Sequence, residues 1–253
     1  MSEVVAYRLA AQQERAEGLR ARMQQLLAPL DGSERALDSG CGAGALAFAL
    51  APFVESVVGV DLSEDLVAAG NAVAPPNCEL RVGDSTSLPF EYGSFDIAGC
   101  MRVLHHAQRP ELVVSELARV TRPGGRLALA TWVPDGGIGK MFSMTAPFQP
   151  PPPDGAGAPL DWGKPEHVEE LLGDAFELSF ETRTSIDRGE SGEAFWQFYV
   201  ENFGPVKTLA ESLDDDRREE FHRAYVEFFD TNYRSAGGIE YPREWLLVTG
   251  TRR

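Results

Sequence analysis

The chain has 253 residues, three cysteines and a formal net charge of −16 at pH 7. This length suffices for one large domain, or for a domain with a smaller unit, without disulfide or metal staples. The strong negative charge disfavours nucleic acid as a partner, because phosphate backbones would be repelled. The odd number of widely spaced cysteines indicates neither a disulfide framework nor a zinc site.

The N-terminus shows no basic start followed by an apolar run, and no stretch of about 18 apolar residues occurs. We therefore expect a cytoplasmic protein with no secretory signal, no membrane span and no bound metal. The sequence does not indicate an oligomeric state.

The first predicted element is a helix over residues 3–28. Apolar residues between Leu9 and Leu27 repeat with the spacing of one helical face. Pro29 and the turn at residues 31–33 end the pattern.

Strands and helices then alternate from residue 35 to residue 132. Short apolar runs that end in turn residues predict strands, and segments with helical spacing predict helices, two of them stopped by proline. The strands are expected at 35–38, 54–61, 79–83, 95–101 and 126–132, and the helices at 43–51, 64–73 and 111–121. This alternation predicts a parallel sheet with helices on both faces.

The pattern breaks at residue 133. The proline-rich stretch at 148–159 predicts a loop or semi-rigid linker. A helix at 166–172, a strand at 177–185 and a closing strand at 245–251 are expected after it.

Residues 190–235 predict an inserted pair of helices with aromatic faces. The first face carries Phe195, Phe198, Tyr199 and Phe203, and the second carries Phe221, Tyr225, Phe228 and Phe229. The acidic run at 214–216 suits the start of the second helix, where unpaired backbone N–H groups lie. Core packing accounts for most of these aromatic residues.

The glycine loop at residues 40–45 fits two cofactor templates. As G-x-G-x-x-A it is a dinucleotide fingerprint, and as D-x-G-x-G-x-G from Asp38 it is the loop that binds S-adenosylmethionine. The methionine end of S-adenosylmethionine carries an ammonium group that an acid can bind, whereas an acid would repel pyrophosphate. Asp38 therefore favours the sulfonium cofactor.

Two further acids end the next two predicted strands. Asp61 can accept both ribose hydroxyls, although it could instead cap the helix that begins near Glu64. Asp84 can accept the adenine amino group with the Ser85 N–H nearby, although Gly-Asp-Ser is also common in turns. Open α/β sheets bind ligands at the carboxyl ends of their strands, so we expect Asp38, Asp61 and Asp84 to form one site.

With these motifs, the chain resembles the class I S-adenosylmethionine-dependent methyltransferases, of the small-molecule type that includes the ubiquinone and menaquinone biosynthesis enzymes. The matching segments are 37–44, 59–63, 83–90, 94–96, 104–106 and 122–126. The resemblance implies an α/β, Rossmann-like, seven-stranded, mostly parallel sheet with helices on both faces. The last strand would be antiparallel and inserted between the fifth and the sixth.

The resemblance also implies which residues contact the cofactor. They are Asp38, Gly40, Cys41, Gly42, Gly44, Asp61, Leu62, Asp84, Ser85, Cys100 and Met101. We expect three parts: an N-terminal helix at 1–34 that covers the active site, a cofactor-binding core at 35–185 and 241–253, and a helical insert or lid at 186–240.

The predicted function is transfer of a methyl group from S-adenosylmethionine to an oxygen or carbon of a small, aromatic or apolar acceptor. A non-catalytic S-adenosylmethionine-binding module and an NAD(P)-dependent oxidoreductase are the alternatives. Methyl transfer depends mainly on positioning, and a base is needed only if the acceptor must lose a proton. Candidate bases are His106, His222 and Tyr225, and Tyr7 and Trp132 are candidates for the pocket wall.

Overall fold

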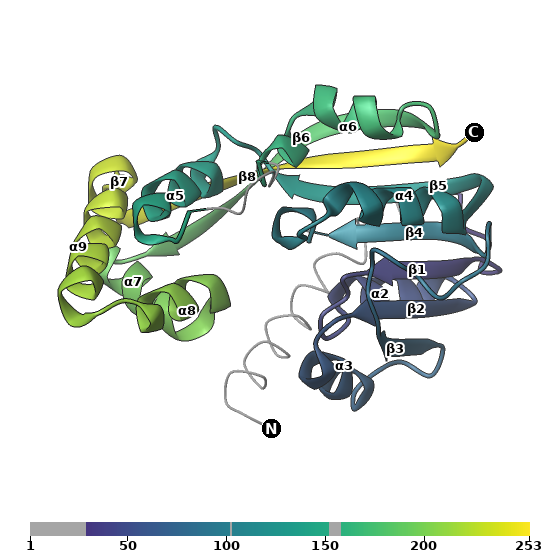
Figure 1. Cartoon of the computed structure of the whole chain (residues 1–253), viewed down its shortest axis with the longest axis horizontal. Coiled ribbons are helices and arrows are strands. Elements are labelled where there is room, and N and C mark those ends of the chain that lie inside the picture. Colours follow the sequence, from purple (N-terminus) through teal and green to yellow (C-terminus); the bar gives the residue numbers. More distant parts are fainter. Residues whose placement is uncertain (1–28, 102, 152–157) are drawn as a thin grey trace. The chain divides into compact units, whose positions relative to one another are not determined.

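The computed structural model describes residues 29–101, 103–151 and 158–253 (Figure 1). The helix expected over residues 3–28, with Tyr7, lies outside the described residues. The chain divides into two compact units. Unit 1 runs up to Thr131 and also contains 162–181 and 246–253, and unit 2 contains 132–161 and 182–245. The predicted insert at 186–240 thus falls within unit 2, together with a segment that precedes it by some 25 residues.

Among the described residues, eight strands form one sheet in the order β3-β2-β1-β4-β5-β8-β6, with β7 paired to β8. Their bounds are β1 Arg35–Ser39, β2 Ser56–Asp61, β3 Cys78–Val82, β4 Phe95–Met101, β5 Thr121–Trp132, β6 Phe176–Gly189, β7 Arg234–Ser235 and β8 Gly238–Arg252. The pairs β1–β2, β1–β4, β2–β3 and β4–β5 are parallel.

The Rossmann-like architecture expected from the sequence is confirmed. Figure 1 shows β8 running opposite to β5, and β8 lies between β5 and β6 in the sheet. The expected number of seven strands was wrong by one. The additional strand is β7, only two residues long, which pairs with β8 in the antiparallel direction through Arg234–Ile239 and Ser235–Gly238.

Helices and short 3₁₀ turns connect the strands. They are α2 Ala45–Leu50, η1 Ala51–Phe53, α3 Glu64–Asn71, η2 Leu104–His106, α4 Pro110–Val120, α5 Gly137–Thr145, η3 Ala146–Phe148, η4 Asp161–Gly163, α6 Pro165–Leu172, α7 Gly192–Asn202, α8 Gly204–Ser212 and α9 Asp215–Asn232. The helices expected at 43–51, 64–73, 111–121 and 166–172 correspond to α2, α3, α4 and α6.

The helical pair expected at 190–235 is in fact three helices. Helix α7 ends with Phe203 as its C-cap, and the same residue is the N-cap of α8. Pro205 lies in the first turn of α8. Proline has no N–H to continue the hydrogen bonds of α7, but it is well suited to start a new helix.

Helix α5 was not expected, because glycines at 137 and 139 lower helix propensity. Both glycines lie where a Cβ atom would collide with backbone, that of Pro242 for Gly137 and that of Pro134 for Gly139. The Gly137 N–H donates a 2.7 Å hydrogen bond to the Glu244 carboxylate. Close packing and this bond to β8 therefore override local propensity.

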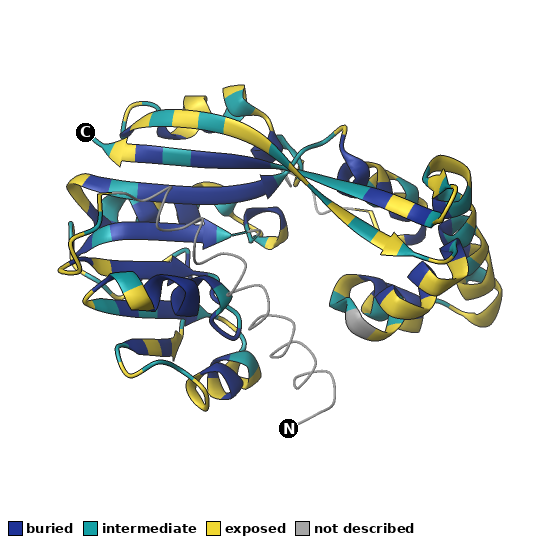
Figure 2. Ribbon diagram, turned by 180° about the vertical axis from the view of Figure 1, so that it is seen from behind, coloured by how far each residue is buried: buried dark blue, intermediate teal, exposed yellow. Residues whose placement is uncertain are grey.

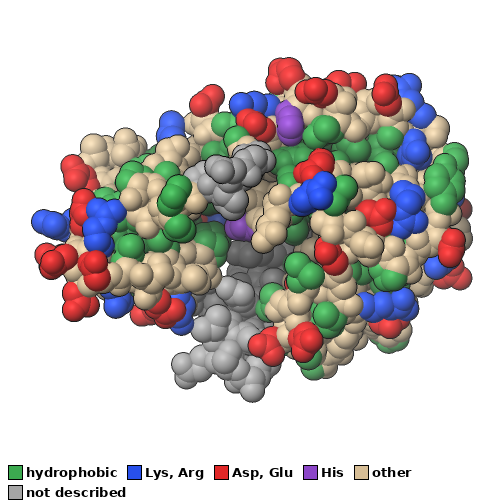
Figure 3. All heavy atoms as spheres, viewed as in Figure 1, with side chains coloured by type: hydrophobic (Ala, Val, Ile, Leu, Met, Phe, Trp, Pro, Cys, Tyr) green, Lys and Arg blue, Asp and Glu red, His purple; other side chains and the backbone are tan. Residues whose placement is uncertain are grey.

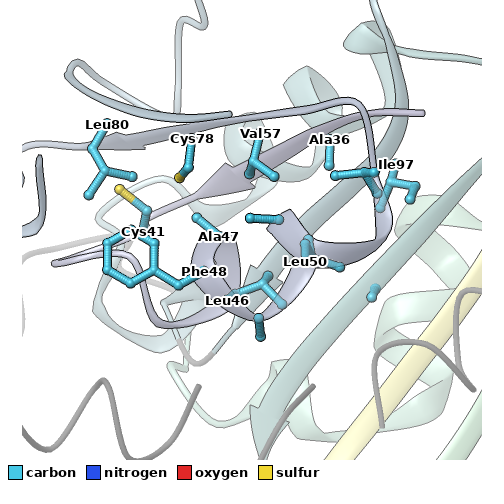
Figure 4. Packing of buried hydrophobic residues seen from close by; sticks show 14 of the residues in the cluster. Ala36, Cys41, Leu46, Ala47, Phe48, Leu50, Val57, Cys78, Leu80 and Ile97 are labelled. Atoms are coloured by element: carbon cyan, nitrogen blue, oxygen red, sulfur yellow. The ribbon is translucent and has the colours of Figure 1, made fainter. Parts of the chain in front are cut away.

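The core of unit 1 lies between α2 and the strands β1, β2 and β3 (Figure 4). Strands β1 and β4 are almost wholly buried, while the edge strand β3 alternates between buried and exposed residues (Figure 2). At Gly59 a Cβ atom would lie 2.5 Å from Leu80 and 2.8 Å from the Cys41 sulfur. This close packing fixes the glycine loop against β2 and β3.

The core of unit 2 is aromatic, as expected for the insert. Helices α7 and α9 stack Phe195 on Phe229, with ring centroids 4.5 Å apart, and Tyr225 lies 5.1 Å from Phe229. All three side chains are at most 5% exposed. The expectation that Phe198 shares this face was wrong: it is 49% exposed, because positions 195 and 199 already occupy the buried stripe.

Candidate active site

The glycine loop leads from β1 into α2 in a conformation that requires glycine. Gly40, Gly42 and Gly44 have φ values of 74°, 55° and 93°. A Cβ atom at Gly40 would lie 2.5 Å from the Val103 side chain, and one at Gly44 would lie 2.6 Å from the Phe48 ring. Left-handed backbone and close packing together exclude other residues at Gly40 and Gly44.

We expect Gly40→Ala to lose more stability than Gly32→Ala. Both residues have positive φ, but nothing lies within 4 Å of a Cβ at Gly32. The Gly32 variant isolates the conformational strain, about 1–2 kcal/mol, and the Gly40 variant adds the collision with Val103. Urea denaturation measures both, and equal losses would show that the loop accommodates a side chain.

Asp61 holds the glycine loop from the end of β2. Its Oδ2 accepts a 2.8 Å hydrogen bond from the Gly42 N–H, and its Oδ1 accepts one of 2.9 Å from the Ser63 N–H. The alternative that Asp61 caps α3 is not what the structure shows, since Ser63 is the N-cap and accepts from the Leu66 N–H. Each carboxylate oxygen retains a lone pair for a ligand hydroxyl.

Asp38 is buried and holds the start of α2. Its side chain is 1% exposed, and its Oδ2 accepts a 3.0 Å hydrogen bond from the Ala47 N–H. Gly44, the N-cap of α2, provides no side-chain cap, so Asp38 does so from the strand. Burial raises the pKa of Asp38 to about 7; the bond from Ala47 opposes this rise, and Asp61 adds to it. The expected contact with the cofactor ammonium stays a prediction.

Asp84 and Ser85 follow β3 and lie in the same unit. Asp84 is exposed, and the hydrogen bond of 2.8 Å from the Thr86 N–H to its Oδ1 lowers the pKa of its carboxyl group. Ser85 is 9% exposed, and its Oγ accepts a 2.8 Å hydrogen bond from the Ser39 hydroxyl. This bond connects the end of β1 to the loop after β3.

The remaining expected cofactor contacts differ in exposure. Leu62, directly after Asp61, is 72% exposed, whereas Met101 is half-buried against the unit 1 core. The side chains of Cys41 and Cys100 are at most 5% exposed, and burial raises the pKa of both thiols. These two cysteines therefore lack reactive thiolates, as expected for small core residues.

The three candidate bases lie in different environments. His106 belongs to η2, after β4, and is exposed at the surface of unit 1; surrounding atoms desolvate its ring and lower its pKa. His222 and Tyr225 lie on α9 in unit 2. His222 Nε2 is 2.7 Å from Glu193 Oε2, and the Tyr225 hydroxyl is buried against the Met141 sulfur. Burial raises the pKa of Tyr225 well above its ordinary value, which is unfavourable for a base.

The sequence reasoning did not single out Ser39, which lies inside the motif between Asp38 and Gly40 and is fully buried. A polar residue at the buried end of an apolar strand was the available signal. Among the described residues, no group of His, Cys, Asp and Glu side chains could hold a metal ion. None of the described helices is long and apolar enough to cross a membrane.

The chain shares a domain with known proteins. Residues 37–129 match the family model described as methyltransferase domain. Protein Rv1405c of Mycobacterium tuberculosis, uncharacterized, is 26% identical over 226 residues, which cover 87% of this chain and 81% of the relative.

Solved structures share the fold at low sequence identity. Protein BH2331 of Bacillus halodurans superposes with a TM-score of 0.64 at 24% identity, covering 91% of this chain and 97% of that one. Geranyl diphosphate C-methyltransferase of Streptomyces coelicolor, solved with geranyl diphosphate and S-adenosyl-L-homocysteine, has a TM-score of 0.55 at 17% identity. That match covers 97% of this chain and 82% of the enzyme.

Residues 37–129 are a methyltransferase domain, and the protein is an S-adenosylmethionine-dependent methyltransferase. S-adenosylmethionine is its cofactor, so the nicotinamide alternative for the glycine loop is set aside. The similarity to the quinone-biosynthesis subgroup stays a prediction.

Proposed function

We propose that this enzyme methylates an oxygen or a carbon of a small organic acceptor with aromatic or apolar character. The observation that carries the proposal is the arrangement of Asp61, Asp84 and the glycine loop at the carboxyl ends of adjacent parallel strands. The small acceptor of the Streptomyces coelicolor enzyme, geranyl diphosphate, and the aromatic content of unit 2 support this class.

The residues of unit 1 fit the cofactor by their chemistry. Asp61 offers carboxylate oxygens to the ribose hydroxyls, and the exposed carboxylate of Asp84 can accept from the adenine amino group. Leu62 offers an apolar surface next to Asp61. The backbone N–H groups where the glycine loop enters α2 suit the carboxylate at the methionine end of the cofactor. When bound, the cofactor supplies an electrophilic methyl group on a positively charged sulfur.

His106 is the residue we assign to proton removal when the acceptor is a hydroxyl. It lies just after β4, at the edge of the sheet where the acids gather. Its lowered pKa keeps the ring neutral near pH 7, so that it can accept a proton. Removal of the hydroxyl proton makes the oxygen a better nucleophile, whereas the carbon nucleophile of an alkene needs no base before attack.

Transfer of radiolabelled methyl groups from S-adenosylmethionine tests the proposal. The purified chain is incubated with separate sets of phenols, prenyl diphosphates, amines and carboxylic acids, and extracted products are counted. Label in phenols or prenyl compounds supports the proposal. Label only in amines contradicts the acceptor class, and cofactor binding without any transfer across the sets favours a non-catalytic binding module.

For a phenolic acceptor, we expect His106→Gln to lower kcat at least tenfold at pH 7 with little change in the KM for S-adenosylmethionine, since general base catalysis contributes about 10²–10⁴-fold. The control is His167→Gln, which alters a histidine on α6. Equal kcat values for the His106 variant and the unmodified enzyme would exclude His106 as the base.

A further inference from the structure

Three buried hydrogen-bond donors of unit 2 lack a partner among the described residues. They are the hydroxyl groups of Tyr233 and Tyr241 and the Nε of Arg243. The Tyr241 side chain is fully buried. Buried donors are almost always paired in native proteins, because an unpaired donor loses its hydrogen bonds to water and gains none in return. Three such donors in one place therefore indicate a site that receives a hydrogen-bond acceptor.

The three donors come together on one side of β8. Tyr241 and Arg243 are alternate residues of this strand, so their side chains leave the same face. The ring of Tyr233, the C-cap residue of α9, packs edge-on against the ring of Tyr241 with centroids 4.9 Å apart. Tyr233 is half-buried and the Arg243 side chain is 22% exposed, so the group extends from the aromatic core to the surface of unit 2.

All three atoms can donate, whichever way the hydroxyl hydrogens point. A guanidinium Nε never accepts a hydrogen bond. Burial raises the pKa of Tyr233 and of Tyr241 above the ordinary value, so both hydroxyls keep their hydrogens at neutral pH. The ligand atom that fits such a set is an oxygen with lone pairs and no hydrogen of its own, as in a carbonyl group or a carboxylate.

The charges around the donors decide between these two groups. Asp187 Oδ1 lies 2.7 Å from Arg243 Nη2 and neutralises the guanidinium. The Glu244 carboxylate adds a negative charge that opposes ionisation of the Tyr233 hydroxyl. Acidic side chains also lie on the surface of unit 2 around α9 (Figure 3). A carboxylate would therefore be repelled, and a neutral carbonyl oxygen is favoured.

The side chains packed beside the donors are aromatic. The Tyr241 ring meets the Phe229 ring edge-on with centroids 4.9 Å apart, and it meets the Phe195 ring edge-on with centroids 6.0 Å apart. Such rings offer faces and edges to a further flat ring, and a few placed polar groups then fix its orientation. The body of the ligand is accordingly expected to be an aryl group.

We propose that Tyr233, Tyr241 and Arg243 bind the carbonyl oxygen of a neutral aromatic acceptor, such as a phenol that carries a ketone. This inference rests on the proposed function, because it concerns the acceptor of that same reaction. It goes beyond that function by naming a polar group of the acceptor and the residues of unit 2 that select it.

Isothermal titration of the full chain, saturated with S-adenosylhomocysteine, tests the proposal with matched probes. 4-Hydroxyacetophenone carries the carbonyl, 4-ethylphenol lacks only that oxygen, and 4-hydroxybenzoate carries an ionised carboxylate at neutral pH. We expect the unmodified protein to bind the ketone at least about tenfold more tightly than either of the others, since one hydrogen bond contributes up to about that factor. Equal affinities, or failure of the ketone to bind, would overturn the inference.

Tyr241→Phe removes one donor and keeps the ring. It should lower the affinity for 4-hydroxyacetophenone about tenfold and leave that for 4-ethylphenol within about twofold. Arg243→Lys can keep the ion pair with Asp187 but has no donor at the ε position, and it should reduce the preference for the ketone in the same way. Tyr225→Phe is the matched control, because its hydroxyl already contacts the Met141 sulfur, and it should leave the preference unchanged.

A stability measurement separates ligand binding from a structural role. The free Tyr241→Phe variant should resist urea at least as well as the unmodified protein, because its lost hydroxyl has no partner among the described residues. A loss of stability, or an unchanged preference for the ketone, would overturn the inference.

The transfer of label judges the proposed function separately. Label in phenols without any preference for the ketone would keep the proposed function and reject this site. A ketone preference that Tyr241→Phe abolishes would support the site, and it would do so even where no phenol is labelled, a result that contradicts the proposed function alone.

Discussion

Asp61→Ala is expected to raise the dissociation constant for S-adenosylmethionine by at least about 100-fold, since hydrogen bonds to charged groups contribute roughly 1.5–3 kcal/mol each. The substitution removes the carboxylate proposed to accept from the ribose. It also releases the Gly42 N–H, which Asp61 Oδ2 holds at 2.8 Å, so the glycine loop loses its contact with the end of β2. Calorimetric titration measures the loss directly.

Asp65→Ala is the matched control for this experiment. Asp65 lies in the first turn of α3, is exposed and carries the same charge, so its removal changes the overall electrostatics by the same amount. We expect the affinity of the Asp65→Ala variant for S-adenosylmethionine to stay within about twofold of that of the unmodified enzyme, because an exposed charge away from the ligand contributes little. Similar affinities for the Asp61 variant and the unmodified enzyme would place the ribose elsewhere and remove the basis of the site.

Asp61→Asn distinguishes the proposed contact with the ribose from the hydrogen bonds that Asp61 makes within the protein. An asparagine side chain has one acceptor oxygen, whereas Asp61 accepts from Gly42 through one oxygen and from Ser63 through the other. One of these N–H groups would then face an NH₂ group. We expect the Asn variant to lose both affinity and stability, although its shape is conserved. A fully stable Asn variant with weak binding would show that the ribose contact alone carries the effect.

Local sequence patterns were sufficient to place the acids at the ends of their strands. Asp38 and Asp61 follow apolar runs, Asp84 follows an alternating strand, and parallel strands bring their carboxyl ends to one edge of a sheet. The strand at 95–101 was predicted with the bounds that β4 has. The positions of Asp38, Asp61 and Asp84 therefore depend on chain order and on the parallel arrangement, both of which a single sequence reveals.

What the sequence could not reveal are the partners of each side chain. The bond from Ala47 to Asp38 and the bond between Ser39 and Ser85 join residues 9 and 46 positions apart in the chain. Such contacts depend on which way a side chain points after the sheet has formed. The same limit applies to Asp38, whose burial at 1% exposure the sequence did not indicate.

Contacts between segments distant in the sequence also caused one of the two errors in the prediction of helices. Helix α5 depends on glycines that allow contact with Pro242 and on a bond to Glu244, more than 100 residues away. Its own sequence, interrupted by Gly137 and Gly139, predicts no helix. The division of the predicted helical pair, in contrast, had a local cause in Pro205, and closer attention to proline at a helix start would have revealed it.

Asp38→Asn is expected to remove a pH dependence of stability that the unmodified protein shows between about pH 4 and pH 7. Burial raises the pKa of Asp38 from 3.8 to about 7. In this window the folded protein retains a proton that the unfolded chain releases. The free energy of unfolding contributed by this group therefore falls as pH rises and levels off above about pH 7, a total of about 4 kcal/mol at 1.36 kcal/mol per pKa unit.

The Asn variant keeps an oxygen to accept from the Ala47 N–H but has no charge to bury. At pH 8 it should be more stable than the unmodified protein by a few kcal/mol, and at pH 4 the two should be nearly equal. Urea denaturation at intervals of one pH unit measures the difference, in which the contributions of all other titrating groups largely cancel. A difference that is the same at pH 4 and pH 8 would mean that Asp38 titrates normally in the folded state.

The same substitution should weaken S-adenosylmethionine binding at pH 8, because the cationic cofactor is favoured by an ionised carboxylate near the glycine loop. In the unmodified protein, affinity should accordingly fall as pH decreases below about 7, where Asp38 becomes protonated. If both results are obtained, Asp38 destabilises the free protein and strengthens cofactor binding, a compromise typical of buried charges at functional sites. A variant that gains stability and binds the cofactor with undiminished affinity would separate the two effects and assign Asp38 to capping α2 alone.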